Sequence, residues 1–319
     1  MILTSTFILS ILFATIFEKQ LASFIRICRK LVGKEFIKDF SFDENGIDQL
    51  DVGTINGKFY GKQYHPVFLA HKALEMLDNS SFDQAGFLQI SDWLSTNIKP
   101  ENNNFLLYNY PNPHYQMDAP WFSAMAQGRA LEVMVHAFQL TEDKKYHLAA
   151  EKILASLEIE IKDGGATYKT ETAGWWYEEY PTKRIKQPRV LNGMMYTLQG
   201  LIKYKTLISD TQADELLNQG LLALEQQLPN YDKKGDSYYD IHKTTTGGDY
   251  HQLHIAQLKL IHDYSKNSIF LDYARRWEKF DQQTFILRLI RKPSKINLSV
   301  YIIALFISGV IGLVYKILH

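Results

Sequence analysis

Hydrophobic residues recur at helical spacing through most of the chain. Between positions 66 and 280, apolar side chains return every three or four residues in about eight separate runs, which is the pattern of one buried helix face. The first run opens at Pro66, which suits a first helical turn. The other runs lie at 90–98, 131–138, 146–157, 191–202, 217–228, 255–261 and 270–280. The succession predicts antiparallel helical hairpins, in a toroid or an open solenoid. No fixed period repeats between the pairs, which argues against a regular solenoid.

Three long segments interrupt the helical pattern, at 99–120, 162–189 and 229–249. They are rich in Tyr, Trp, Asn and Gly, so we expect ordered loops that line a cleft. Within them, "GGATYKT" (Gly164–Thr170) and "GDSYYDI" (Gly235–Ile241) alternate like short strands. The predicted fold class is therefore mostly α, with a small β-hairpin at the cleft.

The two ends of the chain are apolar. Ile296–Tyr315 is twenty residues long and carries no charge, which is enough for a helix to cross a bilayer. Ile2–Phe17 is also uncharged but has sixteen residues, so a short span, a signal sequence and a membrane-surface helix all fit it. Cleaved signal peptides carry basic residues before the apolar run, whereas only Met1 stands here. We therefore expect an uncleaved anchor at this end.

These patterns predict four parts: a hydrophobic anchor at 1–20, a basic linker at 21–58, a helical domain at 59–285 and a transmembrane helix at 296–316. Basic residues flank the helical domain on both sides, and such flanks stay on the cytoplasmic side or bind its anionic headgroups. We therefore expect a membrane protein whose helical domain faces the cytoplasm. The flanking residues are Lys19, Arg26, Arg29, Lys30, Lys34, Lys38, Arg288, Arg291, Lys292 and Lys295.

Composition excludes several classes of function. The 319 residues carry a formal net charge of zero, so no basic excess indicates a nucleic-acid partner. Cys28 is the only cysteine, which excludes an intramolecular disulfide and a cysteine zinc site. His251 and His254 stand one helical turn apart and could be half a metal site, but the sequence offers no further ligands. We expect no metal and no cofactor, and we expect these histidines to be satisfied polar residues or substrate contacts.

Candidate chemistry lies in the loops, above all in "GWWYEEYP" (Gly174–Pro181). A buried carboxylate can remove a proton, and a phenol normally donates one. This pairing suits proton transfer at a carbon beside a carboxylate, as well as glycoside hydrolysis by two acids. The adjacent Glu178 and Glu179 cannot easily both face one bond. We expect Glu178 to cap the loop or to pair with Lys183 or Arg184.

Six blocks between Trp121 and Leu258 carry a resemblance to a known family. They are "WFSAMAQGRALEVMVHAFQLTED", "WYEEYP", "VLNGMMYTLQGL", "LPNYD", "YYDI" and "DYHQLHIAQL". In this order they resemble the carboxy-terminal domain of D-glucuronyl C5-epimerase, the family that converts glucuronate to iduronate within heparan sulfate and heparin. The resemblance implies an α/α toroid, an isomerase activity and a uronic-acid-containing polysaccharide as substrate. A homodimer is left open.

The resemblance also implies site residues. The catalytic set carried over is Glu179, Tyr180, Tyr239 and Tyr250, with proton removal on one face of the sugar and return on the other. The residues expected to contact substrate are Trp176, Tyr177, Arg129, Arg189, Asn192, His242, His251 and His254. Which catalytic residue is base and which is acid does not follow from the sequence.

This sequence departs from the family pattern at its arginines. His242 and Gly248 stand where arginines are typical, so Arg129, Arg184, Arg189 and His242 are the candidates to neutralise a substrate carboxylate. We also expect this chain to lack the family's long amino-terminal β-rich region. Two alternatives to an epimerase stay open. One is a polyuronide lyase, which begins with the same proton removal, and the other is a non-catalytic glycan-binding domain tethered to a membrane.

Overall fold

The computed structural model describes residues 2–31, 40–77, 82–208, 210–246, 248–283, 285–291 and 295–318. The chain divides into two compact units, one made of Met1–Ile37 with Glu278–His319 and the other of Lys38–Trp277. Of the basic flanking residues, Lys34, Lys38 and Lys292 lie outside the described residues.

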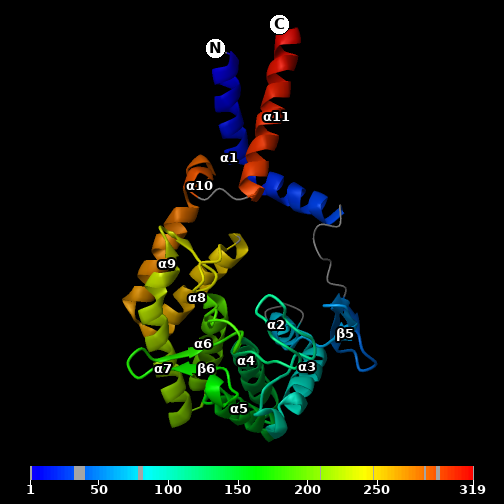
Figure 1. Ribbon diagram of the computed structural model, residues 1–319, viewed down its shortest axis with the longest axis vertical. Coiled ribbons are helices and arrows are strands. Elements are labelled where there is room, and N and C mark those ends of the chain that lie inside the picture. Colours follow the sequence, from blue (N-terminus) through cyan, green and yellow to red (C-terminus); the bar gives the residue numbers. More distant parts are fainter. Residues whose placement is uncertain are drawn as a thin grey trace. The chain divides into compact units, whose positions relative to one another are not determined.

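The larger unit is built from helical hairpins (Figure 1). Consecutive helices pair α2 with α3, α4 with α5 and α6 with α7, and each of the eight apolar runs coincides with one helix. The prediction of successive hairpins is thereby confirmed. The helices are α2 (Pro66–Leu77), α3 (Gln84–Asn97), α4 (Ala124–Thr141), α5 (Lys144–Leu157), α6 (Leu191–Lys205), α7 (Thr211–Gln227), α8 (Gly248–Ser265) and α9 (Ser268–Asp281).

The even-numbered helices form an inner layer. Helix α2 packs on α4, α4 on α6 and α6 on α8, while α3 contacts α5 and α5 contacts α7 outside them. The chain reverses once within each hairpin and once more between hairpins, so neighbouring inner helices run in the same direction. The contact between α4 and α6 is especially close, since a Cβ added at Gly200 would overlap the carbonyl oxygen of Gly128. The amino-terminal ends of the inner helices therefore gather at one end of the unit.

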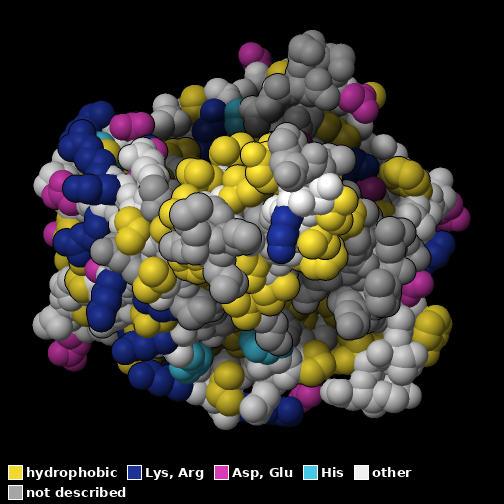
Figure 2. Space-filling view, turned by 90° about the horizontal axis from the view of Figure 1, so that it is seen from above, with side chains coloured by type: hydrophobic (Ala, Val, Ile, Leu, Met, Phe, Trp, Pro, Cys, Tyr) yellow, Lys and Arg dark blue, Asp and Glu magenta, His cyan; other side chains and the backbone are white. Residues whose placement is uncertain are grey.

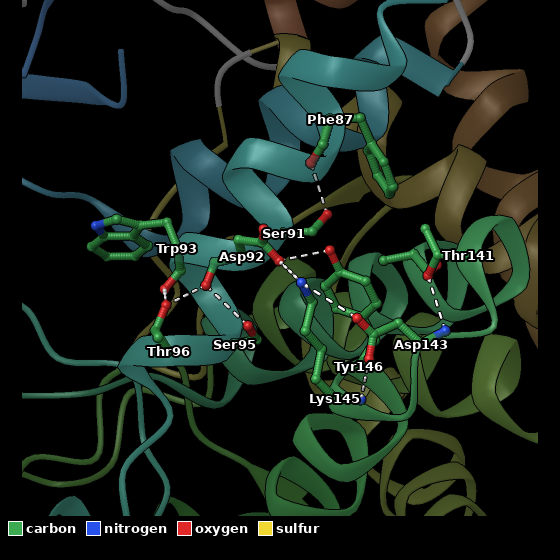
Figure 3. Close-up of polar contacts among 11 residues, drawn as sticks. Phe87, Ser91, Asp92, Trp93, Ser95, Thr96, Thr141, Asp143, Lys145 and Tyr146 are labelled. Atoms are coloured by element: carbon green, nitrogen blue, oxygen red, sulfur yellow. Dashed lines mark hydrogen bonds and ion pairs between the residues drawn. The ribbon is translucent and has the colours of Figure 1, made fainter. Parts of the chain in front are cut away.

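Polar contacts join the outer helices α3 and α5 (Figure 3). The Tyr146 hydroxyl donates to Asp92 at 2.7 Å, and Lys145 Nζ lies 2.7 Å from the same carboxylate oxygen. Asp143 caps the start of α5 by accepting from the Lys145 backbone N–H at 2.9 Å. Because Asp92 is half-exposed, we expect this network to contribute on the order of 1 kcal/mol to stability.

Short strands precede the first hairpin. The strands β1 (Phe40–Phe42), β2 (Asp48–Asp51) and β5 (Lys62–Gln63) form an antiparallel sheet, and β3 (Thr54–Ile55) pairs with β4 (Lys58–Phe59). Lys72 of α2 pairs with Asp48 at 2.5 Å, and Ile47 joins the helical core. Of the segment 21–58, which we expected to be a linker, residues 40–58 lie in the larger unit, whereas residues 21–31 belong to the smaller one. These strands are too short to show a clear alternation of apolar and polar residues in the sequence.

The loops contain two short hairpins. Strand β6 (Thr167–Lys169) pairs with β7 (Trp175–Tyr177), and β8 (Asp232–Lys233) pairs with β9 (Asp236–Ser237). The predicted strands at 164–170 and 235–241 are found, but each has its own partner. Strand β7 was not predicted, because nothing in the sequence indicated that "WWY" is extended. The 3-10 turns η1 (Pro100–Asn102), η2 (Ile161–Asp163) and η3 (Leu228–Tyr231) complete the loops.

The smaller unit consists of α1 (Ile2–Leu31), α10 (Phe285–Arg291) and α11 (Lys295–Leu318). Helix α1 has non-helical dihedral angles at Phe17 and packs along α11, so that both termini lie at the same end (Figure 1). Asn297–Ile317 is long and apolar enough to cross a membrane, whereas the apolar part of α1, Thr6–Glu18, is shorter. Figure 2 gives the view from above, with hydrophobic side chains in yellow and Lys and Arg in dark blue.

Candidate active site

The "WYEEYP" segment connects the inner helices. After β7, the Glu178 backbone N–H donates to the Ala166 carbonyl at 2.8 Å, and the Glu178 carbonyl accepts from the N–H of Ala124 at 3.0 Å. The second bond satisfies an N–H at the start of α4, which would otherwise lack an intrahelical partner. The main chain is therefore fixed at the point where Glu179 begins.

Glu179 lies against helix α6. A Cβ added at Gly193 would lie 2.5 Å from Glu179 Oε2, so only glycine leaves room for this carboxyl group. The side chain is 7% exposed. Burial raises the pKa of Glu179 to about 7, and a hydrogen bond from Tyr180 opposes that rise. A carboxyl group with this pKa exchanges protons readily near neutral pH.

Three tyrosines follow from Glu179 in a chain of contacts. The Tyr180 side chain neighbours both Glu179 and Tyr239, and its hydroxyl lowers the pKa of each. The rings of Tyr239 and Tyr250 meet edge to face with centroids 5.0 Å apart. Burial, then the Glu179 charge, raises the pKa of Tyr180, Tyr239 and Tyr250, so all three keep their protons at neutral pH. The structure thus brings together the four residues named as catalytic from the sequence.

Tyr239 is positioned by the start of α6. Its carbonyl accepts from the Leu191 N–H at 3.0 Å at the start of α6, and its own N–H donates to Thr244 at 2.8 Å. The following Asp240 is buried and accepts from both the Thr244 N–H and the Thr244 hydroxyl. Tyr250 stands in the first turn of α8 and is 44% exposed. The four residues therefore run from a buried acid to a phenol that solvent can reach.

The first long loop supplies an aromatic wall that sequence reasoning did not resolve into residues. Tyr115 stacks on Tyr180 with centroids 4.1 Å apart, and Trp121 lies 5.7 Å from the same ring. Tyr108 stacks in turn on Trp121 at 3.9 Å. Gln127 of α4 holds the loop by bonding the backbone of Asn104 and Leu106. The density of aromatics in this loop was the available signal, but it did not show which rings meet Tyr180.

Glu178 has a different place from its neighbour. It is fully buried, and its carboxylate accepts from the Arg189 backbone N–H at 3.1 Å instead of pairing with Lys183 or Arg184. Burial raises the pKa of Glu178 to about 8. Arg189 has a left-handed backbone (φ 47°) and its carbonyl accepts from the Tyr231 hydroxyl at 2.5 Å. Glu178 therefore holds the turn before α6.

The candidate cations lie in different places. Arg189 stacks over Tyr168 at 4.8 Å and donates to Gln227, while exposed Arg184 pairs with Asp118. The exposed His242 ring bonds the carbonyl oxygen of Lys186. Arg129 is different, because its guanidinium lies 4.8 Å over the ring of Tyr196 on α6. Of these four cations, only Arg129 contacts a ring on the helix that touches Glu179.

Two residues expected to contact substrate are core residues. Trp176 is 2% exposed and stacks on Tyr231, and Tyr177 is fully buried with its hydroxyl donating to the Leu216 carbonyl. Strand β7 turns these rings into the helical core, so the expectation that they form walls for a sugar is corrected. Asn192 is also buried, and its carbonyl accepts from Gln257 Nε2 at 3.3 Å.

His251 and His254 belong to a buried polar cluster. Both Nδ1 atoms lie within 2.9 Å of the Ser237 hydroxyl, and His251 Nδ1 lies 3.2 Å from Asp236. This cluster joins α8 to β9, two residues before Tyr239. Since both rings are buried, they are placed to position Tyr239 and Tyr250, and the expectation of direct substrate contact is corrected.

Sequence comparison agrees with this arrangement. Residues 102–279, which include all four converging residues, match the family described as D-glucuronyl C5-epimerase C-terminus. The chain belongs to this family. Over 177 residues, this C5-epimerase-family protein is 35% identical to the D-glucuronyl C5-epimerase of Caenorhabditis elegans. That match covers 49% of this chain, and the chain spans 28% of the nematode enzyme.

Another relative matches at greater coverage. An uncharacterized protein of Methanocaldococcus jannaschii is 23% identical over 266 residues, which are 76% of this chain and 85% of that protein. Two solved structures share the fold of this C5-epimerase-family protein. They are cellobiose 2-epimerase from Bacillus thermoamylovorans (TM-score 0.51, 11% identity, 86% of this chain, 74% of that chain) and a GH76 α-mannanase of Bacteroides thetaiotaomicron (0.50, 12%, 86%, 72%). The fold is thereby of the α/α toroid class.

Proposed function

We propose that this protein is a uronate epimerase that inverts C5 of D-glucuronate residues to L-iduronate in a heparosan- or heparan-like polysaccharide. Family membership and the identity to the nematode D-glucuronyl C5-epimerase support the activity. The observation that supports a role for particular residues in this activity is the series of contacts from Glu179 through Tyr180 to Tyr239 and Tyr250.

Glu179 is the proposed base. The C5–H bond breaks, the proton goes to Glu179, and the electron pair moves toward the sugar carboxylate to give an enediolate. A base works best when its pKa lies near the working pH. Burial raises the pKa of Glu179 to about 7. Glu178 is unsuited to this role because its carboxylate is occupied by the Arg189 N–H below the site.

Tyr239, or Tyr250 beside it, is the proposed acid. Its raised pKa keeps the phenol protonated, so it can deliver a proton to the other face of C5. One turnover then leaves a proton on Glu179 and a phenolate on the acid. Tyr180 neighbours both Glu179 and Tyr239 and influences the pKa of each, so it is placed to take the proton from Glu179 and give its own to a Tyr239 phenolate, which resets the site. The amino-terminal ends of α4, α6 and α8 face the same region and favour negative charge there.

Proton exchange at C5 tests the proposal. Purified full-length protein is incubated with uronate oligosaccharides in deuterated water, and deuterium at C5 is followed by NMR. Glu179→Gln is expected to lower the exchange rate by about a hundredfold or more, since general base catalysis contributes typically 10²–10⁴-fold. Glu75→Gln, on an exposed face of α2, is the control and should exchange at the unaltered rate.

Two results would contradict the epimerase. Absorbance from an unsaturated sugar end would indicate a lyase, which expels the 4-linked oxygen after the same proton removal. Binding of uronate oligosaccharides without any exchange would indicate a glycan-binding domain. Full activity of Glu179→Gln would remove this residue from the mechanism.

The proposal extends to the membrane. The apolar helix α11 is the proposed membrane anchor. The basic residues that flank the larger unit favour a position of this unit at the cytoplasmic surface of the membrane. There the protein would meet a uronate polymer during or soon after its synthesis.

A further inference from the structure

We propose that Arg129, backed by Glu132 and lying over the ring of Tyr196, binds the carboxylate of the uronate ring from which Glu179 removes the C5 proton. The inference rests on the proposed function and names the cation that its chemistry requires. The resemblance implies arginines where this chain has His242 and Gly248, so the cation is sought among the other basic residues near the site.

Helix packing brings Arg129 to this place. Gly128 and Gly200 let α4 and α6 approach so closely that no side chain fits between them. Arg129, the next residue on α4, therefore reaches the face of α6 that carries Tyr196. Tyr196 stands three residues after Gly193, which touches Glu179. Residues three apart lie on one helix face, about one turn from each other, so Arg129 and Glu179 approach the same strip of α6.

Electrostatic coupling agrees with this placement. Burial raises the pKa of Tyr196; of the neighbouring titratable groups, Arg129 lowers it whereas Tyr250, Glu132 and Glu179 raise it. Tyr196 therefore lies within electrostatic range of the cation as well as of the proposed base and Tyr250. A uronate ring bound at the edge of Tyr196, whose face Arg129 covers, would meet this cation and would have Glu179 nearby.

Arg129 has donors left for a ligand. Its side chain is 13% exposed, and one terminal amine bonds Glu132 at 2.6 Å. Among the described residues, its Nε has no hydrogen-bond partner. Guanidinium groups recognise carboxylates through two parallel N–H bonds, and Glu132 occupies only one of the amines. Glu132 thus fixes the orientation of the cation, and donors remain for a second carboxylate.

A neutral histidine borders the same place. His71 of α2 lies 5.0 Å from the Tyr196 ring, and its Nε2 has no hydrogen-bond partner among the described residues. Burial and the Arg129 charge lower the pKa of His71 to about 4, so the ring is neutral at pH 7. A neutral imidazole can bond a sugar hydroxyl without competing for the carboxylate. The chemistry of this subsite therefore fits a sugar acid better than a neutral sugar.

The other cations are placed less well for this role. Arg184 is exposed and paired with Asp118, and His242 bonds the Lys186 carbonyl. Arg189 stacks over Tyr168 beside buried Glu178. An enediolate needs its positive charge at the carboxylate oxygens, and a preorganised cation in a partly buried site is worth more there than one in water.

Binding to two matched oligosaccharides tests the inference. In full-length protein in detergent, with Glu179→Gln to stop turnover, calorimetry measures Kd for a uronate oligosaccharide and for the same oligosaccharide with its carboxylates reduced to alcohols. Arg129→Gln is expected to raise Kd for the uronate form about tenfold or more, because hydrogen bonds to charged groups are the strong ones. The Kd of the reduced form should hardly change, and Arg129→Lys should fall in between.

Arg276→Gln is the matched control. Arg276 also pairs with an acid, Asp232 at 3.0 Å, and also lies over a tyrosine, Tyr273 at 5.1 Å, but it stands on α9 and is 57% exposed. It should leave both Kd values unchanged. Equal weakening of both ligands by Arg129→Gln, or no weakening, would overturn the inference. If the unaltered chain neither exchanges C5 protons nor binds the uronate form, the proposed function itself fails.

Discussion

At the scale of single residues, two adjacent glutamates differ because their surroundings differ. Glu178 accepts a backbone N–H and closes a turn, while Glu179 faces a row of tyrosines. From the sequence we expected Glu178 to cap the loop or pair with a cation, and the family resemblance implied Glu179 for the chemistry. It could not supply the partner of Glu178, because Arg189 reaches that carboxylate only through the fold of the loop.

The pH dependence of exchange is one prediction at this scale. If Glu179 is the base, kcat/KM for C5 exchange should rise with pH through about 7, because the carboxylate must lose its proton first. Tyr180→Phe removes a hydrogen bond that favours the charged form, so the rise should move to higher pH. Exchange rates measured from pH 5 to 9 check this. A profile that is flat across this range would contradict the role of Glu179.

Stability against pH is the second prediction at this scale. Burial raises the pKa of Glu178 from 4.5 to about 8, so the folded chain holds this proton where the unfolded chain has lost it. Stability should therefore fall as pH rises from about 4.5 through about 8. Glu178→Gln keeps an acceptor for the Arg189 N–H and should flatten this fall, by about 1.4 kcal/mol for each unit of pKa. Thermal melts at pH 5 and pH 9 measure it; an unchanged difference between them would count against the ionisation of Glu178.

At the scale of elements, the contact between α4 and α6 decides the geometry of the site. Gly193 makes room for Glu179, and Gly200 lets α4 come close enough for Arg129 to reach Tyr196. Helix periodicity showed that both helices exist. It gave no sign of how closely they approach, since that depends on which glycines face each other.

Gly200→Ala tests this contact. The added Cβ would overlap the Gly128 carbonyl, which belongs to backbone and cannot rotate away. We expect a loss of about 1–3 kcal/mol in the free energy of unfolding, as is typical of overpacking, although alanine favours helices. Chemical denaturation measures it. Gln199→Ala, at the half-buried position before it, is the control and should cost much less.

At the scale of the whole molecule, the helical unit lies between two apolar ends in the sequence. Helix α11 has the length and composition to cross a membrane, and α1 packs along it within the smaller unit. The sheet of β1, β2 and β5 belongs to the larger unit, so the unit begins earlier in the chain than the hydrophobic pattern alone indicated.

The side of the membrane is a prediction at this scale. In a Cys28→Ser background, Lys162→Cys places a thiol at a position that is 70% exposed in the larger unit. The basic flanks predict that an impermeant thiol reagent will not label it in intact cells and will label it after lysis. A cysteine on the known outer side of another membrane protein controls for the reagent. Labelling in intact cells would place the unit outside.

The sequence by itself determined the helices, their pairing and the family, because apolar spacing and ordered motif blocks are local properties that need no contact information. It also named the four residues that converge at the candidate site. Only the tertiary structure decided which aromatics face that site. Trp176 and Tyr177 entered the core on an unexpected strand, whereas Tyr115 and Trp121 came to Tyr180 from a distant loop. The direction of a side chain in an irregular loop depends on what packs against it, and sequence spacing carries no record of that.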